Sequence, residues 1–161
     1  MTGTRGEERE ADRLSGAAVR AVGIDAVDVA RFRRVMTRRP RIADRVFTDS
    51  ERAHAAAASD PAPRLAARFA AKEAVMKALG VGIGALAMRD VEVVKTEGGA
   101  PRIELAGTAE AIALRRGIGA WHVSLTHTDL VAIASVIAVG DGAVGGASAS
   151  AIDVGSSGAV T

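Results

Sequence analysis

The pattern of hydrophobic and polar positions predicts a strand followed by a helix near the start of the folded region. Residues 21–27 are mostly apolar, as a short strand would be. Beyond them, apolar side chains recur at the three- and four-residue spacing of a helix, at Val29, Phe32 and Met36. Another face of this helix carries arginines, at Arg31, Arg34 and Arg38. Since proline cannot continue a helix, the helix is predicted to end at Pro40.

Two more helices are predicted before residue 80. In the segment 47–51, Thr48 or Ser50 can cap a helix and acidic residues lie in its first turn, so an alanine-rich helix is expected to run to about Ala58. Prolines 61 and 63 suit the first turn of the next helix, because the backbone donors there are free in any case. That helix is expected to reach Leu79, with Gly80 just past its end.

The second half of the chain predicts two hairpins separated by a short helix. The expected strands are residues 90–95, 101–105, 120–126 and 130–139, and the helix starts at Thr108 and stops at Gly117. Glycines at 98 and 99 mark the first turn, and residues 127–129 form the second. The order β-α-α-α-β-β-α-β-β predicts an α+β fold with a mainly antiparallel sheet.

The two ends of the chain differ from its middle. Residues 1–20 are polar, mixed in charge and without apolar periodicity, which predicts a disordered N-terminal extension. Residues 140–161 are rich in Gly, Ala and Ser, which predicts a flexible tail. A single folded domain is therefore expected over residues 21–139.

Composition excludes several classes of function. The chain has no cysteine, so thiolate zinc sites, disulfides and a cysteine nucleophile are ruled out; this suits a reducing cytoplasm, the expected location. No signal peptide is visible, and the longest apolar run, residues 130–139, is about half of what a bilayer needs, so a soluble protein without a membrane partner is expected. With one Trp, three Phe and no Tyr, binding of single-stranded nucleic acid is disfavoured.

Positive charge is concentrated in the predicted domain. Residues 21–139 hold 17 basic and 13 acidic side chains, and arginines crowd the segment 31–45. A basic patch of this kind favours an acidic partner, although an arginine stripe is also an ordinary solvated helix face.

The segment 68–80 carries the clearest candidate chemistry. On a helix it places Glu73 among the cations Arg68, Lys72 and Lys77, with alanines around it that leave room for a ligand. A second carboxylate, Asp25, follows the apolar run 21–24 near the end of the predicted strand, where an unpaired acid is costly. Magnesium in proteins takes one or two carboxylates and completes its shell with water and phosphate oxygens. The two acids therefore predict a magnesium-bound phosphate ester, provided that the fold brings them together.

Each of these residues has a structural alternative. Glu73 and Lys77 are four residues apart, a spacing that stabilises a helix by about 0.2–0.5 kcal/mol without any function. Asp25, or Asp28, could cap the following helix. The alternating glycines at 80, 82 and 84 follow a helix, whereas phosphate-binding glycine loops precede one. His127 lies in a predicted turn, where a histidine is usually just solvated.

Taken together, these segments resemble a known family, the holo-(acyl-carrier-protein) synthases, the small class of 4′-phosphopantetheinyl transferases. The resemblance covers nearly all of residues 21–139. It rests on Val22-Gly23-Ile24-Asp25, Arg31, Phe47-Thr48, Arg68-Phe69-Ala70-Ala71-Lys72-Glu73-Ala74, Lys77-Ala78-Leu79-Gly80-Val81-Gly82-Ile83 and Val123-Ser124-Leu125-Thr126-His127.

The resemblance implies a reaction and a set of residue roles. The reaction is magnesium-dependent transfer of phosphopantetheine from coenzyme A to a serine of an acidic acyl carrier protein of fatty-acid or polyketide synthesis, releasing adenosine 3′,5′-bisphosphate. The implied metal ligands are Asp25 and Glu73. The implied substrate-binding residues are Arg68, Lys77, Gly80, Gly82 and His127. The implied carrier-protein contacts are Arg31 and Arg34.

The resemblance also implies an assembly and leaves one step open. Small members of the family are homotrimers with active sites at subunit interfaces, so a homotrimer with a single-lobe fold is expected. The serine proton could pass to Glu73 directly or to a metal-bound water, and the sequence does not choose between them. A competing hypothesis is a non-catalytic module that binds an acidic protein through the arginine-bearing helix.

Overall fold

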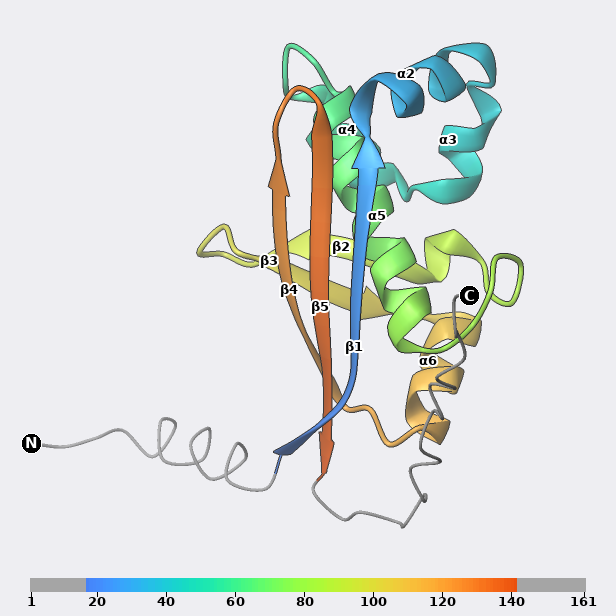
Figure 1. Ribbon diagram of the computed structural model, residues 1–161, viewed down its shortest axis with the longest axis vertical. Helices are drawn as coiled ribbons and strands as arrows, with labels where there is room; N and C mark the ends of the chain where they lie inside the picture. Colours follow the sequence, from blue (N-terminus) through green and yellow to red (C-terminus); the bar gives the residue numbers. More distant parts are fainter. Residues whose placement is uncertain (1–16, 142–161) are drawn as a thin grey trace, which may run out of the picture.

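The computed structural model describes residues 17–141, which form an α+β structure with antiparallel sheets (Figure 1). The predicted fold class is therefore confirmed. The elements in chain order are β1 (Ala17–Asp28), α2 (Val29–Arg38), α3 (Arg41–Val46), α4 (Asp49–Ala56), α5 (Ala62–Ala78), the 3-10 turn η1 (Met88–Asp90), β2 (Val91–Lys95), β3 (Pro101–Leu105), α6 (Gly107–Arg115), β4 (Ala120–His127) and β5 (Val131–Asp141).

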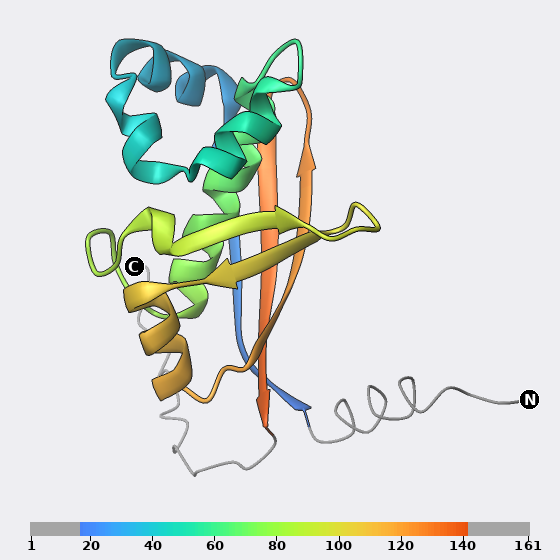
Figure 2. The same ribbon diagram turned by 180° about the vertical axis from the view of Figure 1, so that it is seen from behind.

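The larger sheet has three strands in the order β1-β5-β4, so β1 and β4 form its opposite edges. In its register Asp25 on β1 lies across from Ala134 on β5, which lies across from Leu125 on β4. The β2–β3 hairpin and α5 lie on the same side of this sheet (Figures 1 and 2). Its other face is not covered by any helix of residues 17–141 (Figure 1).

Helix α5 is the centre of the core, because its small side chains let the backbones of helix and sheet come close. Ala70, Ala71 and Ala74 are fully buried, together with Val75. On β1, a Cβ atom added to Gly23 would lie 1.9 Å from the carbonyl oxygen of Ala74. Only a glycine therefore permits this approach, and a glycine within a strand often marks such a contact.

A second cluster of apolar side chains packs α2 and α3 against α5 at one end of the larger sheet (Figure 1). The Phe32 ring contacts the ring of Phe47 edge-on, with centroids 6.3 Å apart. Thr48 caps α4 and forms a reciprocal capping box with Glu51, which confirms the predicted helix start. No helix within residues 17–141 has both the length and the hydropathy needed to cross a bilayer.

Several predicted boundaries were wrong. Strand β1 begins at Ala17 and not at residue 21, and β5 continues to Asp141, since main-chain pairing between these two strands extends beyond the apolar pattern. The short helix α3 was missed, because Pro40 was treated only as the end of α2. The remaining residues of the predicted extension and tail, 1–16 and 142–161, lie outside the described structure.

Candidate active site

The candidate site lies where β1 crosses α5. Residues of a strand that are two positions apart share a face, so the close approach at Gly23 turns Asp25 toward the same helix. Asp25 lies within β1, three residues before its end, and it is Asp28 that caps α2 by accepting a hydrogen bond from the backbone N–H of Arg31. Helix capping, the structural alternative for Asp25, is therefore assigned to Asp28.

Lys77 binds the Asp25 carboxylate. Its Nζ atom lies 2.7 Å from Oδ1 of Asp25 and donates a second hydrogen bond, 3.0 Å long, to the backbone oxygen of Ile24. The Asp25 side chain is only 16% exposed, whereas that of Lys77 is 54% exposed. The two acids that were predicted to share a site thus come from β1 and α5, and a lysine already lies against one of them.

Glu73 lies beside this pair but is not held by it. Within residues 17–141 no hydrogen bond or ion pair engages its carboxylate, so the expected helix pair with Lys77 is not formed. Partial burial raises the pKa of Glu73; the nearby Asp25 carboxylate raises it further, and Lys77 acts in the opposite direction. This influence of Asp25 indicates that the two carboxylates lie close enough to repel each other, and the metal site itself stays a prediction.

The prediction that Arg68 and Lys72 surround Glu73 was wrong. Lys72 is fully buried on another side of α5, where its Nζ lies 2.8 Å from Oε2 of Glu51. Arg68 is 6% exposed and donates to the backbone oxygen of Arg64 at 3.2 Å. Its Nε atom has no partner among the described residues, and burial lowers the pKa of its guanidinium.

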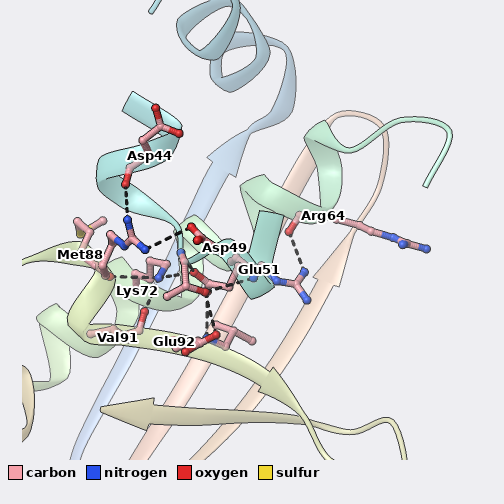
Figure 3. A network of polar contacts seen from close by, with 12 residues as sticks. Asp44, Asp49, Glu51, Arg64, Lys72, Met88, Val91 and Glu92 are labelled. Atoms are coloured by element: carbon pink, nitrogen blue, oxygen red, sulfur yellow. Dashed lines mark hydrogen bonds and ion pairs between the residues drawn. The ribbon is translucent and has the colours of Figure 1, made fainter. Parts of the chain in front are cut away.

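The contacts of Lys72 form a buried network that joins α4, α5 and β2 (Figure 3). Lys72 donates to the backbone oxygens of Met88 and Val91 as well as to Glu51. The other oxygen of Glu51 accepts a hydrogen bond from the backbone N–H of Val93. Burial lowers the pKa of Lys72, and the Glu51 carboxylate opposes this shift by stabilising the ammonium. The network is structural, since its charges satisfy one another away from solvent.

The glycine loop follows directly after the site. Gly80 has a φ of +56° and ends α5, as predicted. A Cβ atom added to Gly82 or Gly84 would meet nothing within 4 Å, so the loop leaves open space around its backbone. Ile83 between them is 88% exposed. Contact between this loop and a substrate stays a prediction.

The remaining predicted site residues do not join Asp25 within one chain. His127 is exposed on β4, at the opposite edge of the larger sheet from β1. The side chains of Arg31 and Arg34 are exposed on α2, as a docking face would require. One chain therefore brings Asp25, Glu73 and Lys77 together, and places Arg68 and His127 elsewhere.

The donor set at the site suits magnesium and not a metal that needs many protein ligands. Within residues 17–141 there is no group of three or more His, Cys, Asp or Glu side chains that could hold a metal ion. Asp25 and Glu73 provide two hard oxygen donors, which is the number that magnesium usually takes from a protein when phosphate and water supply the rest. The repulsion between the two carboxylates is what a bound cation would relieve.

Comparisons with known proteins identify the family of this chain. A family model described as the 4′-phosphopantetheinyl transferase superfamily matches residues 21–132. This chain belongs to that family. The holo-[acyl-carrier-protein] synthase of Frankia casuarinae is 51% identical over 121 residues, which are 75% of this chain and 98% of the relative.

Solved structures of family members have the same fold. The holo-[acyl-carrier-protein] synthase from Neisseria meningitidis matches with a TM-score of 0.68 and 29% identity over 75% of this chain and 98% of that one. The Helicobacter pylori synthase in complex with coenzyme A matches with a TM-score of 0.64 and 32% identity, covering 73% of this chain and 98% of that one.

Sequence reasoning missed one residue that builds the site and one that supports α5. Gly23 was treated only as part of an apolar strand, yet it permits the contact that brings Asp25 to α5. The signal was present, because glycine within a strand weakens it unless another backbone comes close. Glu51 was treated only as a helix-start residue, and no local pattern indicates its long-range pairing with Lys72.

Proposed function

We propose that this chain transfers the 4′-phosphopantetheine group of coenzyme A to a serine hydroxyl of an apo acyl carrier protein. The observation that carries the proposal is the meeting of Asp25, Glu73 and Lys77 at the crossing of β1 and α5. The names of the similar proteins and the coenzyme A bound to the Helicobacter pylori synthase support the same reaction.

The proposed reaction is a phosphoryl transfer, in which positioning and charge neutralisation matter more than covalent help from the protein. The serine oxygen attacks the phosphorus nearest the pantetheine, the bond to the bridging pyrophosphate oxygen breaks, and adenosine 3′,5′-bisphosphate leaves. Asp25 and Glu73 would hold magnesium, which supplies positive charge to the phosphate groups. Lys77 adds a further positive charge from the last turn of α5.

Glu73 is the better placed of the two carboxylates to accept the serine proton. Lys77 is hydrogen-bonded to Asp25, whereas no described residue donates to Glu73.

A homotrimer with sites between subunits is part of this proposal. The uncovered face of the larger sheet carries Val22 and Ile24, each 61% exposed, next to Ile137 at 38%. Exposed apolar side chains grouped on one face often mark an interface. An interface between copies would also explain why His127 lies on the opposite sheet edge from Asp25.

Mixing two inactive variants tests the shared site. We expect Asp25→Asn and His127→Ala each to be inactive alone. Mixed trimers reassembled from both should regain part of the activity. In these trimers some interfaces combine the intact Asp25 of one subunit with the intact His127 of another. Light scattering gives the mass of each assembly. A monomeric active protein, or mixtures that stay inactive although mixed trimers form, would contradict the shared site.

The exposed arginines of α2 are proposed to attract the acidic carrier protein. We expect Arg31→Glu to slow association roughly ten-fold at low salt and to flatten its salt dependence, since long-range attraction mainly raises the association rate. Stopped-flow measurements with Arg115→Glu, an equal charge change on α6, provide the control. Equal effects of the two substitutions would remove α2 as the docking face.

One experiment tests the reaction itself. Apo acyl carrier protein is incubated with this protein, coenzyme A and magnesium, and its mass is measured. The proposal predicts a mass increase of one phosphopantetheine group that disappears when a chelator is present. An unchanged mass together with binding of the carrier protein would favour the non-catalytic module instead. A cytoplasmic location stays a prediction.

A further inference from the structure

The Asp25 carboxylate is paired with a side-chain cation of the protein itself, the Lys77 ammonium. Lys77 donates to its Oδ1 at 2.7 Å and to the neighbouring backbone oxygen of Ile24 at 3.0 Å. The same ammonium acts on Glu73, where it opposes the effects of burial and of Asp25. Lys77 therefore neutralises part of the charge that a divalent ion would neutralise.

We propose that Lys77 is an exchangeable counter-ion: it leaves Asp25 when a divalent cation binds and turns to the phosphate groups of coenzyme A. This inference rests on the proposed function, because it requires the metal site at Asp25 and Glu73. It adds that metal binding and coenzyme A binding each favour the other, because both depend on the position of Lys77.

The surroundings of Lys77 permit such a movement. Its side chain is 54% exposed and its two partners lie on one side of it, on β1. The stem is long and flexible, so a new position costs little. The glycine loop that starts three residues later leaves open space around its backbone at Gly82 and Gly84. Lys72, by contrast, is fully enclosed by its partners.

Electrostatics favour the exchange. An ammonium at 2.7 Å from a carboxylate oxygen and a divalent ion bound directly to the same carboxylate would repel each other. Magnesium and manganese bind carboxylate oxygens directly, so metal binding weakens the hold of Asp25 on the lysine. Without a phosphate to receive it, Lys77 thus opposes metal binding, and with coenzyme A present it favours it. By linkage, metal and coenzyme A must then bind cooperatively.

The chain has only three lysines, Lys72, Lys77 and Lys95, which makes the movement observable. Proton–nitrogen NMR spectra of the side-chain ammonium groups of the full protein should show a protected signal that Lys77→Arg removes. We expect magnesium alone to shift or broaden this signal and leave that of the buried Lys72 unchanged. If the Lys77 signal does not change with magnesium, at metal concentrations where manganese is seen to bind, the exchange is overturned.

Manganese binding measured by electron paramagnetic resonance provides the second test, with Lys95→Gln as the control for charge. Without coenzyme A, Lys77→Gln should bind manganese roughly ten-fold more tightly than the unchanged protein. With saturating coenzyme A the sign should reverse, and Lys77→Gln should bind more weakly. A purely structural lysine would change both affinities in the same direction, which would contradict the proposal.

Failure of the inference can be told apart from failure of the proposed function. If manganese binds the unchanged protein and binding is lost in Asp25→Asn and Glu73→Gln, the metal site stands. An unchanged Lys77 signal then overturns only the exchange. If both carboxylate variants bind manganese as the unchanged protein does, the metal site is overturned and the exchange with it.

Discussion

Two lysines on α5, five residues apart, each bind a carboxylate from another element, and the two pairs differ in almost everything else. Lys72 and Glu51 are both fully buried, and each has backbone partners as well (Figure 3). Lys77 is half exposed, and its partner Asp25 has a second carboxylate, Glu73, as a neighbour. We call Lys72–Glu51 the closed pair, because its partners enclose it. We call Lys77–Asp25, with the neighbouring Glu73, the open pair, because Glu73 is free and Lys77 is able to move.

The difference teaches which ion pair can take part in chemistry. A buried pair loses its hydration and stays favourable only while every partner remains, so it suits fixing α4 and β2 against α5. A pair whose lysine is half exposed is easier to open, because the ammonium regains water, and it can exchange one partner for a ligand. The same two residue types therefore serve as structural support on one side of α5 and as a candidate site on the other.

The largest expected effect is on the open pair. Asp25→Asn and Glu73→Gln should each lower phosphopantetheine transfer on the order of 10²- to 10³-fold, because each removes a charge that the reaction needs. Transfer to apo carrier protein is measured by mass spectrometry, and Glu97→Gln in the β2–β3 turn provides the control. Both variants should unfold at the urea concentration of the unchanged protein or above it. Activity equal to that of the control would show that Asp25 and Glu73 are not needed for the transfer.

The closed pair should behave in the opposite way. Glu51→Gln leaves the Lys72 ammonium buried without its counter-charge, which should lower the free energy of unfolding by about 3–5 kcal/mol. Adding Lys72→Met should restore part of the loss, since the unpaired charge is then removed. Urea unfolding at constant pH measures both. A loss below about 1 kcal/mol in the single variant would show that the pair does not hold α4 and α5 together.

The contact that creates the open pair can be broken without touching a charge. Gly23→Ala would force a methyl group against the Ala74 carbonyl, so we expect about 1–3 kcal/mol lower stability and reduced transfer even in the folded fraction. Gly119→Ala, where a Cβ atom meets nothing within 4 Å, is the matched control. If the two variants have equal stability and activity, the close approach of β1 to α5 is not what positions Asp25.

The smallest expected effect concerns the exposed ion pair between Arg33 on α2 and Asp60. The guanidinium of Arg33, 2.6 Å from the Asp60 carboxylate, lowers the pKa of Asp60, with help from the backbone N–H of Ala62. The folded state thus binds the proton less readily than the unfolded state. The resulting stability is present above the ordinary aspartate pKa of about 4 and is lost as the pH falls through the lower, folded pKa.

Replacing this carboxylate should therefore make the protein slightly less sensitive to acid. Asp60→Asn is expected to flatten the decline in urea-unfolding free energy below about pH 4. Glu97→Gln, which changes an exposed acid in the β2–β3 turn, serves as the comparison. The same slope in both variants would mean that the Arg33 pair does not contribute to acid sensitivity.

Local sequence patterns predicted the fold where one short segment decides the outcome. The capping box at Thr48, the end of α5 at Gly80 and the β2–β3 hairpin all follow from neighbouring residues. The candidate site was predicted only in part, because it depends on contacts between distant segments. The helical spacing of Glu73 and Lys77 indicated a pair between them, yet Lys77 binds Asp25, 52 residues away.

The central claim is that Asp25 and Glu73 share one divalent ion. It is tested most directly by anomalous diffraction from crystals grown with manganese and coenzyme A. The account predicts one manganese peak roughly 2.1 Å from an oxygen of each carboxylate, with the Lys77 ammonium moved away from Asp25. A manganese peak bound elsewhere, with both carboxylates free of it, would contradict the account.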